Sequence, residues 1–426
     1  MIIKRYLHKI VTSKSVTNGI WLYALQFFNL VVPLLTLPYI TRILGSESYG
    51  TFSIALNVIT YLQVVVEYGF GMSATRKVAI EGKKKLNRTF TAVILGRLIL
   101  LLCSLCIAGL YLTVNRGNQS LCISFAILLV CLLGYCVQMN WAFQGLQEMK
   151  YISIINVLGR SISTALIFIF VKSEKDIFVY SLLYSVSPFL SGYFGLFIAK
   201  KRYQLKIIRI SLYDVLSELK DGFYVFTTQL SSKVFGAIGI TFLGIYSTNS
   251  IVGAYSAIQK IPNILILMWS PIAQIIYPIA SARFNSQFLN GYNFVKKIRK
   301  IVMPFFFLVA LGIGLFAQKV VIILFGSEYA TYYMWLYPLL AWLLVAIDNN
   351  FWGIQLLLGS GHDKEYGSAF NISVGITIIV NFLLIYLFSG AGASIAPLLS
   401  EVVLNLLLRK KVVRIIMRES EHGNQL

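Results

Sequence analysis

Twelve stretches of mainly apolar residues follow one another along this chain, with short polar segments between them. A helix needs about 20 such residues to cross the hydrocarbon core of a bilayer. The stretches cover approximately residues 17–41, 50–70, 89–113, 121–141, 151–171, 177–199, 221–246, 250–282, 301–324, 332–358, 367–388 and 389–408. A hydrophobic content of 58% and a charged content of 12% also exclude a soluble domain of this size. The sequence therefore predicts an all-α, polytopic membrane protein with about twelve transmembrane helices.

The basic residues predict how these helices are oriented. With the N-terminus placed inside, 28 of the 37 Lys and Arg residues fall in cytoplasmic segments and five in outer segments. Because short cytoplasmic loops retain positive charge, we expect both termini to be cytoplasmic. The same distribution accounts for the net charge of +21 without a nucleic-acid partner. The segment from Ile2 to Val11 predicts a short amphipathic helix on the inner membrane surface.

The two halves of the chain resemble each other. A shift of 203 residues places Gly19 on Gly222, Gln26 on Gln229, Gly50 on Gly253 and Ser53 on Ser256. Each half then holds six spans, and an even number of spans makes the repeats parallel. We expect two pseudo-symmetric six-helix lobes around a central cavity. The first comprises residues 1–210 with the interfacial helix, and the second comprises residues 211–426 with a basic cytoplasmic tail.

The aqueous segments offer no catalytic pattern. The three histidines lie in separate segments, and no phosphate-binding G-x-x-x-x-G-K-[ST] motif occurs. The five cysteines lie in the third and fourth spans without further metal ligands nearby, which favours small apolar core residues. We therefore expect neither an enzyme, nor a cofactor, nor a metal site.

Four cations lie within the apolar stretches, namely Arg97, Arg160, Lys233 and Lys260. A charge at the centre of a spanning helix costs roughly 2.5 to 3.5 kcal/mol on insertion scales, so such residues usually meet an anion or a water-filled cavity. We expect these four to form a cationic, substrate-binding cavity. The alternative is that each one pairs with a carboxylate within the membrane and serves only as a structural clasp.

The intramembrane acids Glu67, Asp348 and Glu401 have two competing interpretations. A buried carboxylate takes up a proton more readily than an exposed one, so it can carry H⁺, or bind Na⁺, during a transport cycle. It can equally serve as the ion-pair partner of one of the cations. We expect one of these two roles for each acid.

Three groups of residues in the first third of the chain resemble a known family. They are LPYITRILG at residues 37–45 with Tyr49-Gly50, EYGF at residues 67–70 with Thr75-Arg76, and WAFQGL at residues 141–146. These resemble the signatures of the polysaccharide-biosynthesis flippases, the Wzx-type O-unit exporters. Asp is commoner in that family at the position of Glu67, and the C-terminal half has no equally specific motif.

The resemblance implies the fold of the multidrug/oligosaccharidyl-lipid/polysaccharide exporter superfamily, with twelve helices in two lobes and alternating access. It implies an undecaprenyl-diphosphate-linked oligosaccharide as substrate, moved to the outer leaflet of a bacterial plasma membrane for O-antigen or capsule synthesis. A glycan polymerase and a chain-length regulator are the implied partners. The diphosphate would supply the anion for the four cations. Arg42 and Arg76, at opposite ends of the second span, are candidates for gating or for anchoring at lipid headgroups.

Two other transporters fit parts of the pattern. A lipid II-type flippase usually has charged residues within its first span, whereas none occurs here between Lys14 and Arg42. A drug or metabolite antiporter of the same superfamily would favour carboxylates in its cavity. The four basic and three acidic intramembrane residues favour an anionic substrate over that alternative.

Overall fold

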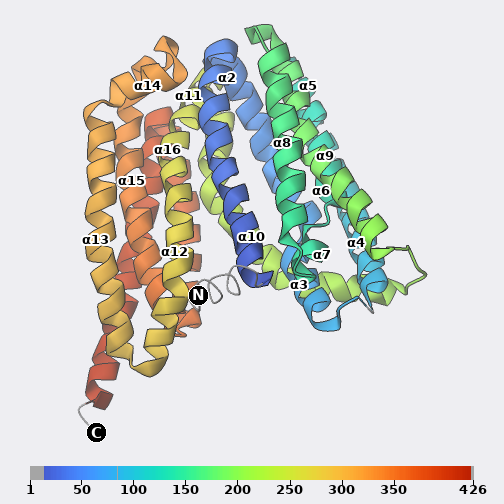
Figure 1. Ribbon diagram of the computed structural model, residues 1–426. Helices are drawn as coiled ribbons and strands as arrows, with labels where there is room; N and C mark the ends of the chain where they lie inside the picture. Colours follow the sequence, from blue (N-terminus) through green and yellow to red (C-terminus); the bar gives the residue numbers. More distant parts are fainter. Residues whose placement is uncertain (1–13, 84, 424–426) are drawn as a thin grey trace, which may run out of the picture. The chain divides into compact units, whose positions relative to one another are not determined.

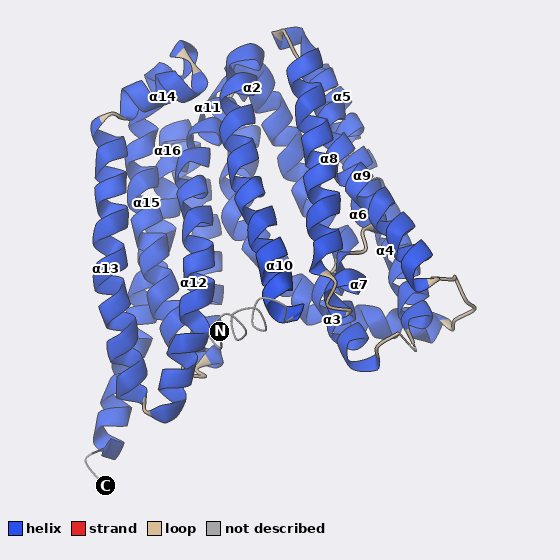
Figure 2. Cartoon of the chain, in the orientation of Figure 1, coloured by secondary structure: helices blue, strands red, loops and turns tan. Residues whose placement is uncertain are grey.

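The computed structural model describes residues 14–83 and 85–423, and all regular structure in these ranges is helical (Figures 1 and 2). The predicted surface helix between Ile2 and Val11 lies outside the described residues, as does Lys84. Nine helical segments within the described ranges are long and apolar enough to cross a membrane. Two of them, α2 (Lys14–Glu67) and α16 (Asp363–Gly423), hold two predicted spans each, and α10 (Leu212–Tyr246) adds another. The predicted all-helical architecture with twelve spans is therefore confirmed.

The helices pack into two compact units. Unit 1 contains the residues up to Thr36 and Ile43–Lys233, and unit 2 contains Leu37–Arg42 and the residues from Val234 onward. Besides most of α2 and the first part of α10, unit 1 holds α3 (Phe70–Glu81), α4 (Leu86–Val114), α5 (Gln119–Leu128), α6 (Val130–Val137), α7 (Asn140–Gly145), α8 (Met149–Phe170), η1 (Glu174–Asp176) and α9 (Ile177–Tyr203). Unit 2 holds α11 (Asn249–Ile258), α12 (Lys260–Ser286), α13 (Phe288–Leu315), α14 (Ala317–Phe325), η2 (Ser327–Trp335), α15 (Leu336–Asn349), the π-helix η3 (Asn350–Leu358) and α16.

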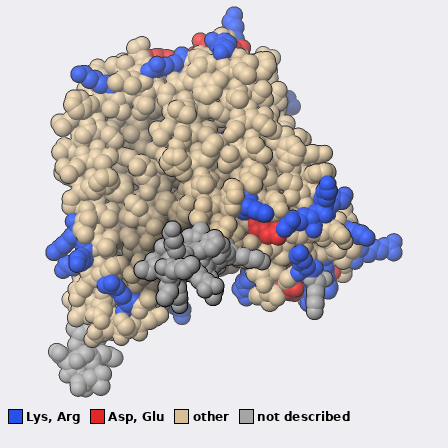
Figure 3. Space-filling model, in the orientation of Figure 1, with Lys and Arg blue, Asp and Glu red and all other residues tan. Residues whose placement is uncertain are grey.

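The surface of these helices suits a bilayer. On the face drawn in Figure 3, Lys and Arg side chains lie near the helix ends, and other residues form the surface between them. Many large apolar side chains of the described residues are exposed, among them Leu110, Leu308 and Leu387. Such an apolar surface would favour aggregation in water, whereas lipid tails solvate it. The protein is thus a multi-pass membrane protein.

The first part of α10 packs within unit 1 through charged side chains. Lys77 of α3 pairs with Glu218, and Arg88 of α4 pairs with Asp214 at 2.7 Å. The hydrogen bond from Arg88 lowers the pKa of Asp214 below its usual value. These contacts attach the first turns of α10 to unit 1, and the lobe boundary at residue 210 stays a prediction.

Two helix breaks support the duplication of the chain. Gly45 interrupts the helical geometry of α2 with φ 69° and ψ 178°, in the left-handed region that glycine tolerates. The position 203 residues later is Thr248, which lies between the end of α10 and the start of α11. The shift that aligns the two halves of the sequence therefore also aligns two helix breaks.

Some predicted boundaries were wrong. The stretch 301–324 is not one helix, because α13 ends at Leu315 and α14 begins at Ala317 as a separate short helix. The basic segment at 296–300, which precedes the apolar stretch in the sequence, lies inside α13. Hydropathy marks where a chain turns apolar, but it does not show where a helix continues beyond the membrane.

One of the motifs that carry the family resemblance, EYGF at residues 67–70, forms a turn of unit 1. Tyr68 and Gly69 adopt positive φ values of 53° and 134° between α2 and α3. A Cβ atom on Gly69 would lie 2.6 Å from the carbonyl oxygen of Gly222 in α10, so only glycine fits there. The ring of Tyr68 stacks on Phe226 of α10, with 4.6 Å between centroids. The EYGF motif therefore builds the junction of α2, α3 and α10.

The WAFQGL motif forms α7, which packs on α3. The Thr75 hydroxyl donates to the Trp141 carbonyl at 3.2 Å, and Gly145 leaves room for Val78. Two motifs far apart in sequence thus make one contact.

Glu148, shortly after α7, accepts hydrogen bonds from Arg202 at 2.6 and 2.9 Å and from the Tyr203 hydroxyl at 2.7 Å. The bonds from Arg202 lower the pKa of Glu148.

Gly134 of α6 and Gly192 of α9 allow these two helices to approach closely. A Cβ on Gly134 would overlap the backbone of Pro188, and one on Gly192 would overlap the backbone of Gly134. Backbone cannot rotate away, so overpacking here is costly. We expect Gly134→Ala to lower the free energy of unfolding by about 2 kcal/mol. Thermal unfolding in detergent measures this, and Gly109→Ala, on the exposed side of α4, is the matched control.

Equal unfolding temperatures for Gly134→Ala and Gly109→Ala would contradict the close approach of α6 and α9. An increase in both variants would show only the higher helix propensity of alanine.

Candidate functional site

Unit 1 encloses a polar cavity of about 260 Å³ between α2, α6, α8 and α9. The side chains that give it its polar character are Asn29, Tyr135, Gln138, Asn156, Arg160, Tyr180 and Tyr184. Every lining residue belongs to unit 1. A cavity of this size and polarity suits a small polar ligand or part of a larger one.

Arg160 supplies the positive charge of the cavity. Its Nη1 group donates a hydrogen bond to the Asn29 side-chain oxygen at 2.7 Å. Among the described residues, no carboxylate forms an ion pair with it. A guanidinium has five N–H donors, so most of them remain available for an anionic ligand. The sequence predicted Arg160 in a substrate cavity between the lobes. The structure places Arg160, and Asn156 one helical turn earlier, in this cavity of unit 1, and the binding of substrate there stays a prediction.

Three tyrosines surround Arg160, and the sequence analysis did not single them out. Tyr180 and Tyr184 of α9 pack edge to face with 6.3 Å between ring centroids, and Phe52 of α2 packs on both, at 4.5 and 5.2 Å. Arg160 is close enough to the hydroxyls of Tyr135, Tyr180 and Tyr184 to interact with them electrostatically. Tyrosine combines an apolar ring with a hydroxyl, which suits contact with a sugar.

Arg97 has a different environment from the one predicted. It is only 3% exposed, and it does not line the cavity. Its Nη1 group donates to the carbonyl oxygens of Tyr135, Cys136 and Gln138, the last at 2.6 Å. Arg97 therefore caps the C-terminal end of α6 and holds in place the two cavity residues Tyr135 and Gln138. Its direct contact with a substrate stays a prediction.

The two predicted lysines lie elsewhere. Lys233 is exposed on α10 at the end of unit 1, and Lys260 is exposed as the first residue of α12 in unit 2. Neither lines the cavity of unit 1. Their role in substrate binding stays a prediction.

The two predicted gating residues differ in their contacts. Arg42 donates to the carbonyl oxygens of Ile322, at 3.4 Å, and Ile323, in the last turn of α14. This is a helix-capping contact within unit 2. Arg76 is exposed on α3 and forms no hydrogen bond or ion pair with the described residues. A gating or headgroup role for either residue stays a prediction.

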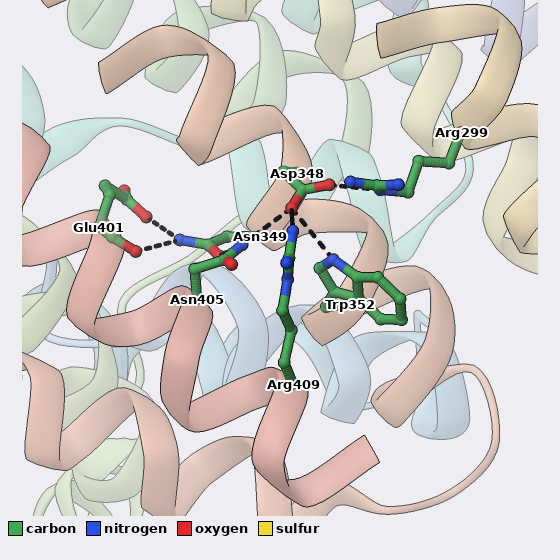
Figure 4. A network of polar contacts seen from close by, with 7 residues as sticks. All are labelled: Arg299, Asp348, Asn349, Trp352, Glu401, Asn405 and Arg409. Carbon is green, nitrogen blue, oxygen red and sulfur yellow. Dashed lines mark hydrogen bonds and ion pairs between the residues drawn. The ribbon is translucent and has the colours of Figure 1, made fainter. Parts of the chain in front are cut away.

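Asp348 is the centre of a buried polar network in unit 2 (Figure 4). Its carboxylate pairs with Arg299 of α13 and, at 2.8 Å, with Arg409 of α16. It also accepts hydrogen bonds from the Trp352 indole at 3.0 Å and from the Asn405 amide at 2.9 Å. This is the ion-pair alternative of the sequence analysis, but its partners are basic residues that were predicted to lie outside the membrane.

Glu401 belongs to the same network through amide side chains. Asn349 donates to the Glu401 carboxylate at 2.5 Å and to its backbone carbonyl at 2.8 Å, and Asn405 donates to the Asn349 oxygen at 2.7 Å (Figure 4). Glu401 is 7% exposed, and no basic side chain pairs with it among the described residues. A buried carboxylate without a cationic partner is the kind of group that binds a proton.

Glu67 ends α2 and is half-buried. It accepts a hydrogen bond from Gln63 at 3.1 Å and lies within electrostatic range of Arg97. It does not line the cavity of unit 1. The three acids are thus divided between the units, with Glu67 in unit 1 and the other two in unit 2.

The comparisons with known proteins agree with this architecture. The family model described as "Polysaccharide biosynthesis protein" matches residues 15–284. The "Putative O-antigen transporter" of Escherichia coli (strain K12) is 28% identical over 92% of this chain and 95% of its own length.

Two solved structures share the fold. The structure titled "Lipid II flippase MurJ, inward closed conformation" superposes with a TM-score of 0.69, at 14% identity, over 93% of this chain and 87% of its own. An inward-facing multidrug resistance MATE family transporter of the MOP superfamily superposes with a TM-score of 0.65, at 16% identity, over 91% of this chain and 99% of its own. At this level of identity, the similarity establishes the fold alone.

Proposed function

This chain belongs to the polysaccharide biosynthesis protein family, a family of transporters and not of enzymes, and from that premise we propose that it is a flippase for lipid-linked glycan units. The substrate would be an undecaprenyl-diphosphate-linked oligosaccharide, moved to the outer leaflet of a bacterial plasma membrane by alternating access. The name of the Escherichia coli relative supports an O-antigen unit as the glycan.

The observation that carries the proposal is the charge of the unit 1 cavity. Arg160 has no carboxylate partner among the described residues, and the amide and tyrosine side chains around it are neutral. Such a site favours an anion with sugar hydroxyls nearby, since a guanidinium binds phosphate oxygens through two parallel hydrogen bonds. The lipid tail would stay in the bilayer while the polar head occupies the cavity.

An antiporter of cationic drugs would need the opposite charge in this cavity. No Asp or Glu lines it, so its field opposes the entry of a cation. A lipid II-type substrate also carries a diphosphate and would suit the same arginine. The cavity therefore favours a diphosphate-linked glycan without specifying its sugars.

Orientation, coupling and partners follow as parts of the proposal. Both termini would be cytoplasmic, as the distribution of Lys and Arg predicts. Glu401 is the candidate for H⁺ coupling, because it is buried without a cationic partner. A glycan polymerase and a chain-length regulator would use the translocated units on the outer side.

Deletion of the gene in its native host tests the proposal. We expect the surface glycan to be lost, with lipid-linked units accumulating on the cytoplasmic side, and we expect the wild-type gene to restore it. Unchanged surface glycan together with a higher sensitivity to cationic drugs would instead support the antiporter alternative.

A further inference from the structure

A second and smaller cavity lies within unit 2, and Trp342 in its wall donates a hydrogen bond to Glu401 of the charged network. Its volume is about 80 Å³, and helices α10, α11, α12, α15 and α16 supply its walls. No Asp, Glu, Lys or Arg lines it. It is therefore a neutral site, unlike the cavity around Arg160.

Three buried polar side chains face this cavity with hydrogen-bonding capacity to spare. Tyr255 is 1% exposed and Gln259 is 9% exposed, and neither side chain has a hydrogen-bond partner among the described residues. Asn381, 2% exposed, donates to the Thr377 carbonyl at 2.9 Å, which leaves its side-chain oxygen available. Buried polar groups are nearly always satisfied, so these groups indicate a ligand with both donors and acceptors.

The remaining walls are mixed. Phe235, Trp342 and Pro397 supply apolar and aromatic surface, and Asn263, Thr377 and Ser400 supply further polar groups. A ligand that fits must therefore combine a hydrogen-bond donor, an acceptor and a small apolar group without a charge. An acetamido group has an N–H, a carbonyl oxygen and a methyl group in this arrangement, whereas a sugar hydroxyl lacks the methyl.

We propose that this cavity binds the acetamido group of an N-acetylated sugar. The proposal rests on the proposed function and deepens it, because it adds a neutral subsite in unit 2 to the anionic subsite in unit 1. The Gln259 and Asn381 amides would bond the N–H and the carbonyl oxygen, and the methyl group would lie against the aromatic walls.

Two variants remove the site in different ways. Tyr255→Phe deletes a single hydroxyl and keeps the ring. In Gly239→Ala the new methyl group would lie 3.2 Å from the Tyr255 hydroxyl and 3.4 Å from the Asn381 oxygen, so it would obstruct both polar groups. Gly375→Ala is the matched control, because Gly375 is exposed in unit 2 and a Cβ there meets nothing within 4 Å.

Saturation-transfer difference NMR on the full-length protein in lipid nanodiscs tests the proposal, with N-acetylglucosamine and glucose as probes. We expect the acetamido methyl protons to receive the strongest saturation, and glucose to give a signal several-fold weaker. Gly239→Ala and Tyr255→Phe should each reduce the N-acetylglucosamine signal several-fold, while Gly375→Ala keeps it. Equal signals for the two sugars, or a signal unchanged in both site variants, would overturn the proposal.

Complementation separates this proposal from the proposed function. If the wild-type gene restores the surface glycan but the purified protein does not prefer N-acetylglucosamine, the acetamido site alone is wrong. If the preference and its loss in the variants are observed while deletion leaves the surface glycan intact, the acetamido site stands and the flippase function is wrong.

Discussion

Replacing Asp348 with alanine is expected to lower the free energy of unfolding by about 3 kcal/mol, the largest stability effect that we predict for a single substitution. The carboxylate pairs with Arg299 and Arg409 and is 6% exposed. Its loss leaves two partly buried guanidinium groups without a counter-charge. We take the lower end of the range known for broken buried pairs, because the Arg409 side chain is 47% exposed and can reach water.

Thermal unfolding of the purified protein, followed by tryptophan fluorescence, measures this loss. Adding Arg299→Met to the Asp348→Ala variant should recover part of the stability, because it removes one of the two guanidinium groups that lack a counter-charge. An Asp348→Ala variant that unfolds at the temperature of the wild type would contradict the clasp role of Asp348.

Replacing Arg160 with glutamine is expected to reduce transport about ten- to hundredfold, the range that corresponds to losing hydrogen bonds between charged groups. Glutamine can still bond Asn29, so the helix packing should survive while the charge is lost. Arg160→Lys should keep part of the activity, since it retains the charge without the planar fork of donors. The measurement is surface glycan in the deletion host at matched expression.

Arg116→Gln is the matched control, because Arg116 is an exposed arginine in the same unit and lies outside the cavity. We expect it to restore the surface glycan. Full activity of the Arg160→Gln variant would exclude Arg160 from the transport path.

Hydropathy was sufficient to predict the twelve spans, because the bilayer requires a long apolar stretch for each crossing. It could not show that the two spans within α2, and the two within α16, meet at single non-helical residues, Gly45 with φ 69° and Ser389 with φ 50°, without a loop between them. Nor could it predict the helical extension of α13 through its basic residues, since a helix in water needs no apolar stretch.

The candidate site was predicted only in part. A charge in an apolar span indicated Arg160, but the same signal indicated Arg97, which caps the end of α6 instead. Both residues satisfy the same physical need for a polar partner, and the sequence does not show whether a backbone carbonyl or a ligand meets that need. The sequence shows Asn29 and Asn349 as polar residues in apolar spans. It does not show that they form hydrogen bonds with Arg160 and Glu401, which lie far away in the sequence.

Under the proposed function, this protein moves a diphosphate-linked glycan lipid across the membrane, and Arg160 binds the charged diphosphate. The most direct measurement is the rate at which a fluorescent undecaprenyl-diphosphate-linked oligosaccharide crosses the bilayer of vesicles containing the wild type or Arg160→Gln. A membrane-impermeant quencher reports the fraction of lipid in the outer leaflet. We predict rapid translocation with the wild type and translocation about ten- to hundredfold slower with Arg160→Gln. Equal rates for the two proteins, or a wild-type rate equal to that of protein-free vesicles, would contradict this proposal.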